Sequence, residues 1–184
     1  TVQTPSASSD IYRYVWDGWV QHDGVNPYRF LPSDAALAHL RDESVYPMIN
    51  RRETARTIYP PFAELVFGAQ AWLGGTVFAM KAWLVAFEFA GIAAMLRLLT
   101  RLGRSRHWIL IYVWHPLPIW EIAGSGHVDA LLVLLVPLAL LGAVLDRRIL
   151  TGLAFGAAVV TKFIPLVLAP ALWRRGDWRM PLAT

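Results

Sequence analysis

Long apolar runs fill the chain from residue 62 onward, and they constrain the fold more than any other feature. Seven of the 13 acidic residues precede Pro61, so the later two-thirds of the chain is sparsely charged. Charged residues make up 16% of the chain and hydrophobic residues 56%, against about 25% and about 45–50% in average globular domains. The pattern predicts a membrane protein with one aqueous segment at its start.

The apolar runs are the expected membrane helices. A full crossing needs about 20 residues, and several runs are shorter or contain proline, which favours half-helices or kinked segments shielded by protein. We therefore expect an all-α, multi-pass transmembrane helix bundle over residues 62–184. Because the chain lacks a signal peptide and a start Met and stops after a basic loop, we expect a fragment of a larger membrane domain, truncated at both ends. The runs are 62–80, 82–99, 108–120, 130–145, 149–161 and 163–173.

Residues 1–61 are polar and rich in aromatic side chains, and we expect an extracytoplasmic loop. Helical spacing predicts one helix from Asp10 to Val20 and a second from Ser33, its expected N-cap, to Glu43. Short helices rich in aromatics and Arg often lie along the membrane interface. The stiff Pro60-Pro61 pair is expected to end the loop.

Charge and cysteine content exclude several classes of function. Arginine clusters beside apolar runs fit the positive-inside rule, so the net charge of +4 requires no nucleic-acid partner. The chain has no cysteine, which excludes disulfides, thiolate catalysis and Cys-ligated zinc.

Two topologies remain open for the first two apolar runs. If residues 62–80 and 82–99 both cross, Arg101–Arg106 lies outside, against the rule; a re-entrant or short hairpin would restore agreement.

Asp10 and Asp17 are the first candidates for chemistry. At a spacing of 3.6 residues they share a helix face with Arg13. Glycosyl transfer needs a carboxylate that takes a proton from the acceptor hydroxyl, and often a cation that holds the departing phosphate. Asp10 and Arg13 supply both groups. The alternative is an N-cap Asp in a local ion pair.

Two further sites lie among the apolar runs. His127 and Asp129 could be ligands or proton-handling groups, or could form a turn in which Asp129 caps the next helix. No structural metal site is expected, since neither Cys nor further His lies nearby. Lys162 sits in an otherwise apolar run, where it could bind a lipid phosphate or reach toward the interface. Partners for Glu64, Glu88 and Glu121 cannot be named from the sequence.

Several motifs occur together in one order. Together they resemble the bacterial polyprenol-phosphate-sugar-dependent mannosyltransferases, which are integral-membrane type C glycosyltransferases. The resemblance spans residues 9–173. It departs from the family pattern at His115, where Asn more often precedes the proline. The motifs are Ser9–Gly18, Asn26-Pro27-Tyr28, Thr57–Pro61, Trp114–Leu117, Gly124–Asp129 and Thr161–Pro165.

The resemblance implies a membrane enzyme that moves a hexose, mannose in this family, from a polyprenyl-phosphate donor to a glycan or lipid acceptor. Asp10 matches the catalytic aspartate of the first extracytoplasmic loop and would be the general base, with Asp17 as a second catalytic candidate. The resemblance fixes no cofactor; a divalent cation is the candidate, because family members differ in metal use. The alternative function is a non-enzymatic membrane transporter or lipid flippase component. Expected substrate-binding residues are Arg13, Tyr59, His127, Asp129 and Lys162.

Overall fold

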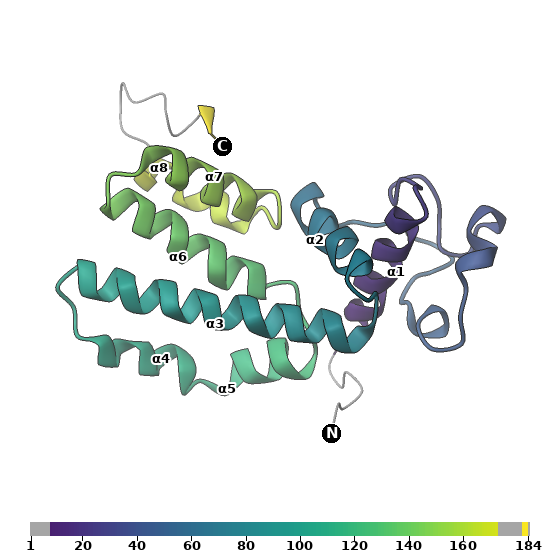
Figure 1. The fold of residues 1–184 in the computed structure, drawn as a ribbon, viewed down its shortest axis with the longest axis horizontal. Coiled ribbons are helices and arrows are strands. Elements are labelled where there is room, and N and C mark those ends of the chain that lie inside the picture. Colours follow the sequence, from purple (N-terminus) through teal and green to yellow (C-terminus); the bar gives the residue numbers. More distant parts are fainter. Residues whose placement is uncertain (1–7, 173–181, 184) are drawn as a thin grey trace. The chain divides into compact units, whose positions relative to one another are not determined.

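The computed structural model describes residues 8–172 and 182–183, and every regular element within them is helical (Figure 1). The all-α prediction is confirmed for this part of the chain. Two compact units divide it: the described residues up to Leu84 with Trp120–His127, and Val85–Ile119 with the residues from Val128 onward. The expected boundary at residue 61 stays a prediction.

The first unit is built on two crossing α-helices and two short 3-10 helices. The elements are α1 (Asp10–His22), η1 (Ala35–Leu40), η2 (Tyr46–Met48) and α2 (Pro61–Trp72). Gly18 lets α1 and α2 approach closely, because a Cβ at this position would lie 2.5 Å from the carbonyl oxygen of Phe67. Around this crossing Tyr14 stacks on Phe67, with ring centroids 4.6 Å apart, and Trp16 is fully buried.

The predicted helix over residues 33–43 is shorter than expected. It is the 3-10 helix η1, and Asp34 rather than Ser33 occupies its N-cap position. The Asp34 carboxylate accepts a hydrogen bond from the backbone N–H of Leu31 and so fixes a turn before the helix. The Asp42 carboxylate accepts from the N–H groups of Val45 and Tyr46, which starts a new turn after it. Side-chain to backbone bonds of this kind compete with helix propagation.

The apolar run over residues 62–80 is not one helix. It is divided at Gly74 and Gly75, whose φ angles of 137° and 55° favour glycine and end the first helix. The second helix, α3 (Val77–Arg101), has 25 residues and is the one described helix long and apolar enough to cross a membrane. Only 17% of its most apolar stretch is buried, unlike the core helix of a soluble protein.

The second unit continues from α3 through short helical pieces into a helical hairpin. The predicted interruption is present at Pro116, where Trp114 and His115 separate residues 110–113 from residues 116–118, but at Pro118 the helix continues into a π-helix. In the hairpin Gly142 faces Thr151, and Phe155 packs with Ala139 and Leu172. The short pieces are η3 (Arg106–Ile109), α4 (Leu110–Val113), α5 (Pro116–Pro118) and the π-helix η4 (Ile119–Gly124), which ends in the first unit. They are followed by α6 (Ala130–Val144), α7 (Arg148–Val159), η5 (Ile164–Leu168) and α8 (Ala169–Leu172).

The hairpin helices α6 and α7 match the predicted runs closely but have 15 and 12 residues. Each is shorter than the roughly 20 residues of a full crossing. The multi-pass architecture therefore stays a prediction. The basic loop expected near the end of the chain, at residues 174 and 175, lies outside the described residues.

Candidate active site

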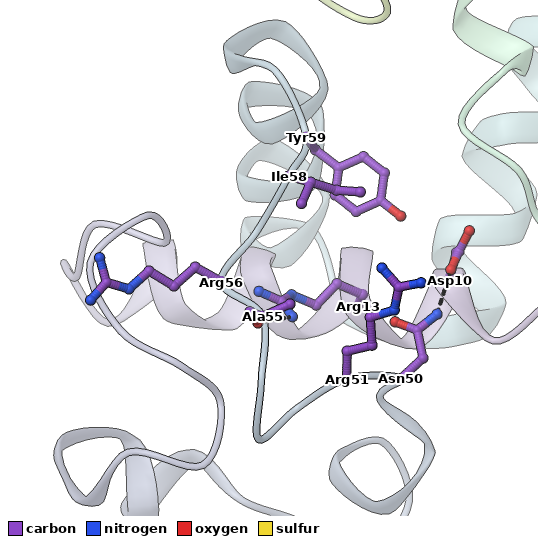
Figure 2. Close-up of a pocket in the computed structure, with 8 residues that line it drawn as sticks. All are labelled: Asp10, Arg13, Asn50, Arg51, Ala55, Arg56, Ile58 and Tyr59. Atoms are coloured by element: carbon purple, nitrogen blue, oxygen red, sulfur yellow. Dashed lines mark hydrogen bonds between the residues drawn. The ribbon is translucent and has the colours of Figure 1, made fainter.

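A pocket of about 260 Å³ lies in the first unit, beside the N-terminal turn of α1. Asp10 and Arg13 reach it from α1, and the remaining lining residues come from the segment between η2 and α2 (Figure 2). A single carboxylate thus shares a small pocket with three guanidinium groups. The lining residues are Asp10, Arg13, Asn50, Arg51, Ala55, Arg56, Ile58 and Tyr59.

Asp10 is the first residue of α1, and its side chain does not cap the helix. Ser9 occupies the N-cap position, without a side-chain capping bond. The Asp10 Oδ1 atom instead accepts a hydrogen bond of 2.6 Å from Asn50 Nδ2, forty residues away in the chain. The alternative interpretation of Asp10 as an N-cap is therefore wrong. Its carboxylate faces the pocket and is oriented by an amide from the opposite wall.

Arg13 is almost fully buried and held on two sides. Its Nε donates to both carboxylate oxygens of Asp17, at 2.9 and 3.1 Å, and one terminal nitrogen donates to the carbonyl of Ala55 at 3.1 Å. The ion pair on this helix face therefore joins Arg13 to Asp17, whereas Asp10, the partner considered from the sequence, bonds to Asn50. Asp17 is only 1% exposed and does not line the pocket. Asp17 thus contacts the site through Arg13.

A second carboxyl lies behind this ion pair. Glu64 Oε1 accepts a hydrogen bond from Thr57 Oγ1 at 2.7 Å, and Oε2 accepts from Gln21 Nε2 at 2.9 Å. Burial, and then the charge of Asp17, raises the pKa of Glu64 to about 9, so this carboxyl is neutral at pH 7. Burial raises the pKa of Asp17 to about 6 against the opposing charge of Arg13, so Asp17 remains ionised there.

Tyr59 forms one wall of the pocket, with its hydroxyl turned toward Asp10 (Figure 2). Its ring packs edge-on against Tyr14 and Phe67. Burial, and then the negative charge of Asp10, raises the pKa of Tyr59, so the hydroxyl stays protonated and can donate a hydrogen bond. Tyr28 donates to the Tyr59 carbonyl at 2.7 Å, which joins two of the sequence motifs.

Three polar or charged residues of the pocket were not predicted from the sequence, and neither were the apolar Ala55 and Ile58. Asn50, Arg51 and Arg56 lie in an irregular segment without a periodic pattern. Arg51 has a φ of 50°, a left-handed conformation that is uncommon for a residue with a side chain. Its carbonyl accepts hydrogen bonds from the N–H groups of Thr54 and Ala55, which closes a tight turn. Arg56 extends away from Asp10 (Figure 2).

The other predicted site residues do not line this pocket. Asp129 occupies the N-cap position of α6 without a side-chain capping bond. Its carboxylate oxygens instead accept hydrogen bonds from Lys162 Nζ at 2.8 and 2.9 Å, in the second unit. His127 Nε2 lies 3.5 Å from Glu121 Oε2 in the first unit. Their substrate-binding roles stay predictions. Glu88, whose partner could not be named from sequence, accepts a hydrogen bond from the Tyr112 hydroxyl at 3.1 Å.

Within residues 8–172 and 182–183, no group of three or more His, Cys, Asp or Glu side chains is placed to hold a metal ion. The arrangement at Asp10 supplies different chemistry. A solvent-accessible carboxylate can accept a proton, while buried and exposed guanidinium groups can hold an anion such as a phosphate through charge-assisted hydrogen bonds. The pocket therefore suits a reaction in which a hydroxyl loses a proton and an anionic group departs.

Comparison with known proteins agrees with this chemistry. Residues 1–174 match the family model described as Alpha-(1->6)-mannopyranosyltransferase, N-terminal domain, of the MptA/B family. No curated protein and no solved structure matches the chain. The family is one of mannosyltransferases, so the prediction of an enzyme is confirmed against the alternative of a transporter or flippase component. The chain belongs to the MptA/B family of alpha-(1->6)-mannopyranosyltransferases.

Proposed function

We propose that this chain carries the donor site of a membrane mannosyltransferase in which Asp10 is the general base. The donor is mannose linked to a polyprenyl phosphate, and the acceptor is a glycan or lipid with a free 6-hydroxyl. The observation that carries the proposal is the shared pocket of the Asp10 carboxylate and the guanidinium groups of Arg13 and Arg51.

In the proposed step, the Asp10 carboxylate takes the proton of the acceptor 6-hydroxyl. The acceptor oxygen forms a bond to C1 of the donor mannose while the bond between C1 and the phosphate oxygen breaks. The electron pair of that bond leaves with the polyprenyl phosphate, whose negative charge is held by Arg13 and Arg51. Asn50 orients the base through its 2.6 Å hydrogen bond, and Asp17 keeps Arg13 extended along α1.

The pocket also supports a single displacement with inversion at C1. Asp10 is the one carboxylate among the residues that line it. A two-step route with retention would need a second carboxylate about 5–5.5 Å away as nucleophile, by the rule that governs glycoside hydrolysis. An α-linked product formed by one inversion requires a β-linked donor. We therefore propose a β-mannosyl polyprenyl phosphate as the donor.

The topology of α3 supports an extracytoplasmic position for this pocket. The pocket belongs to the unit that includes the first turns of α3. Four arginines lie in or just after the last turns of α3: Arg97, Arg101, Arg104 and Arg106. Because α2 has only 12 residues, we propose that α3 alone crosses between these ends. The arginines then lie on the cytoplasmic side, in agreement with the positive-inside rule. Further crossings would make the protein multi-pass.

The donor requirement can be tested directly. Membranes that contain the full chain are supplied with a mannosylated acceptor and one labelled donor at a time: β-mannosyl polyprenyl phosphate, its α-linked isomer, or a nucleotide-linked mannose. We expect transfer from the β-linked lipid donor alone, with an α-(1→6) linkage in the product. Transfer from the nucleotide donor, or equal use of both lipid isomers, would overturn the proposal.

A further inference from the structure

A basic pocket of about 590 Å³ lies in the second unit, outside the proposed catalytic site. Arg97, Thr100 and Arg101 reach it from the last turns of α3, and Arg106 reaches it from the start of η3. Leu141 and Leu145, at the end of α6, form part of its apolar wall. Three guanidinium groups therefore line one pocket together with hydrocarbon side chains.

The backbone after α3 brings the third arginine to this pocket. Gly103 has a φ of 64°, and the N–H groups of Gly103 and Arg104 donate to carbonyls of the last helical turn. This left-handed ending reverses the chain direction directly after the helix. Arg106 is thereby placed with Arg97 and Arg101, whereas Arg104, two residues earlier, does not line the pocket.

The charge of the pocket is not balanced by neighbouring acids. Among the described residues, no carboxylate forms an ion pair with Arg97, Arg101 or Arg106. The negative end of the α3 dipole favours the two arginines in its last turns. Arg106 lies beyond the helix, and placing a third positive charge there costs free energy unless an anion is bound.

The surroundings indicate which anion fits. The pocket lies at one end of the helix that is long enough to cross a membrane, where lipid headgroups are found. Trp108, two residues beyond Arg106, is 60% exposed, and tryptophan is enriched at this depth. Guanidinium groups bind phosphate through paired hydrogen bonds, and the leucine wall can contact the first carbons of an acyl chain.

We propose that this pocket binds the phosphate headgroup of an anionic phospholipid. The inference needs the end of α3 to lie at a membrane surface, but it does not depend on the reaction at Asp10. Binding would fix the depth and tilt of α3 at its basic end. A zwitterionic lipid leaves the three positive charges unbalanced, so we expect preference for a headgroup with net negative charge.

The test uses the full chain purified in detergent and titrated with fluorescent phosphatidylglycerol or phosphatidylcholine in mixed micelles. Arg106→Gln is compared with Arg104→Gln, which removes the same charge two residues away and outside the pocket. We expect Arg106→Gln to weaken phosphatidylglycerol binding about fivefold, the effect of about 1 kcal/mol per basic residue. Arg104→Gln should weaken binding less than about twofold, and the double variant Arg97→Gln/Arg101→Gln should weaken it further than Arg106→Gln.

Three outcomes would overturn the proposal. Equal losses in Arg104→Gln and Arg106→Gln would indicate diffuse surface charge rather than a pocket. Equal binding of phosphatidylcholine would remove the requirement for an anion. Displacement by inorganic phosphate, beyond the effect of a chloride salt at equal ionic strength, would indicate a site for a free anion. Mannosyl transfer measured in parallel keeps this result separate from the catalytic proposal.

Discussion

Asp10 differs from the other acidic residues of the first unit in what its carboxylate contacts. Most of the others are engaged in a structural contact, with a neighbouring cation, a backbone N–H group or a buried hydroxyl. The Asp10 carboxylate contacts the Asn50 amide and otherwise faces the pocket. The structurally engaged acids include Asp17 with Arg13, Asp23 with His39, Asp34 with Leu31, Asp42 with Val45 and Tyr46, and Glu64 with Thr57.

Asn50 is predicted to position the base. Replacing it by Leu removes the 2.6 Å hydrogen bond to Asp10 and lets the carboxylate rotate away from the acceptor hydroxyl. Because small misplacements of catalytic groups cost up to about 100-fold in rate, we expect kcat to fall between about 10-fold and 100-fold, with the KM for the donor unchanged. Initial rates of mannosyl transfer over a range of donor concentrations give kcat and the KM for the donor separately.

Met48→Ala is the matched control for Asn50→Leu, because Met48 is exposed, lies two residues earlier and does not line the pocket. It should leave both constants unchanged. A purely structural role for Asn50 would lower thermal stability and activity together. Unaltered kcat in a folded Asn50→Leu variant would contradict the assigned role.

Glu64 is predicted to make stability fall as the pH rises. Its pKa is about 9 in the folded chain, above the ordinary value of 4.5. The folded state therefore binds more protons than the unfolded state between these values, and the contribution of the neutral carboxyl is lost as the pH approaches 9. Asp17, with a pKa of about 6, acts in the same direction at lower pH, so measurements from about pH 7 to about pH 9 isolate Glu64.

The variant Glu64→Gln stays neutral throughout this range. We expect its melting temperature to fall less with rising pH than that of the unsubstituted chain, by about 2–4 °C for each kcal/mol of lost stability. Glu53→Gln, which alters an exposed acid of the same type, should follow the unsubstituted chain. If melting temperature fell equally with pH in the Glu64→Gln variant and in the unsubstituted chain, Glu64 would be ionised in the folded state.

Among the elements, α2 and α3 show most clearly what the apolar pattern could and could not predict. Hydropathy alone joins residues 62–80 into one run, because Gly74 and Gly75 are not polar. The division depends on their backbone conformation, with φ angles of 137° and 55°, and on a packing contact, since the Gly75 carbonyl accepts a hydrogen bond from Trp19. By contrast, the pattern located α6 to within one residue, since charged residues bound that run.

The division predicts that α3, and not α2, crosses the membrane. Because the chain has no cysteine, single cysteines can be introduced without background. In intact cells, Glu43→Cys in the first unit should react with a membrane-impermeant maleimide, whereas Arg104→Cys, three residues after α3, should react only after the membrane is made permeable.

If the membrane-impermeant maleimide labelled both cysteines in intact cells, residues 43 and 104 would both lie on the outer side. That result would restore the arrangement in which residues 62–80 and 82–99 both cross. Labelling of neither cysteine in intact cells, with both labelled after permeabilisation, would place the proposed active site in the cytoplasm.

At the scale of the whole molecule, sequence reasoning identified the enzyme class and the order of the motifs. It did not identify the pocket residues between η2 and α2, because the contacts that bring them to α1 join segments distant in the sequence. Asn50 lies 40 residues from Asp10, and Ala55 lies 42 residues from Arg13. No local periodicity encodes such pairs, whereas the Arg13–Asp17 pair follows from helical spacing alone.

The central claim is that mannosyl transfer takes place beside Asp10, with its carboxylate as the base. The most direct measurement is the initial rate of label transfer from β-mannosyl polyprenyl phosphate in membranes with the full chain, for Asp10→Asn and Glu53→Gln at equal protein levels. Both substitutions replace an acid by its amide, and Glu53 is exposed and lies outside the pocket.

The account predicts that Asp10→Asn lowers the rate by about 10²–10⁴-fold, the contribution of a general base, and that Glu53→Gln changes it by less than about twofold. Transfer by the Asp10→Asn variant at more than about a tenth of the unsubstituted rate would contradict the account and move the chemistry away from this pocket.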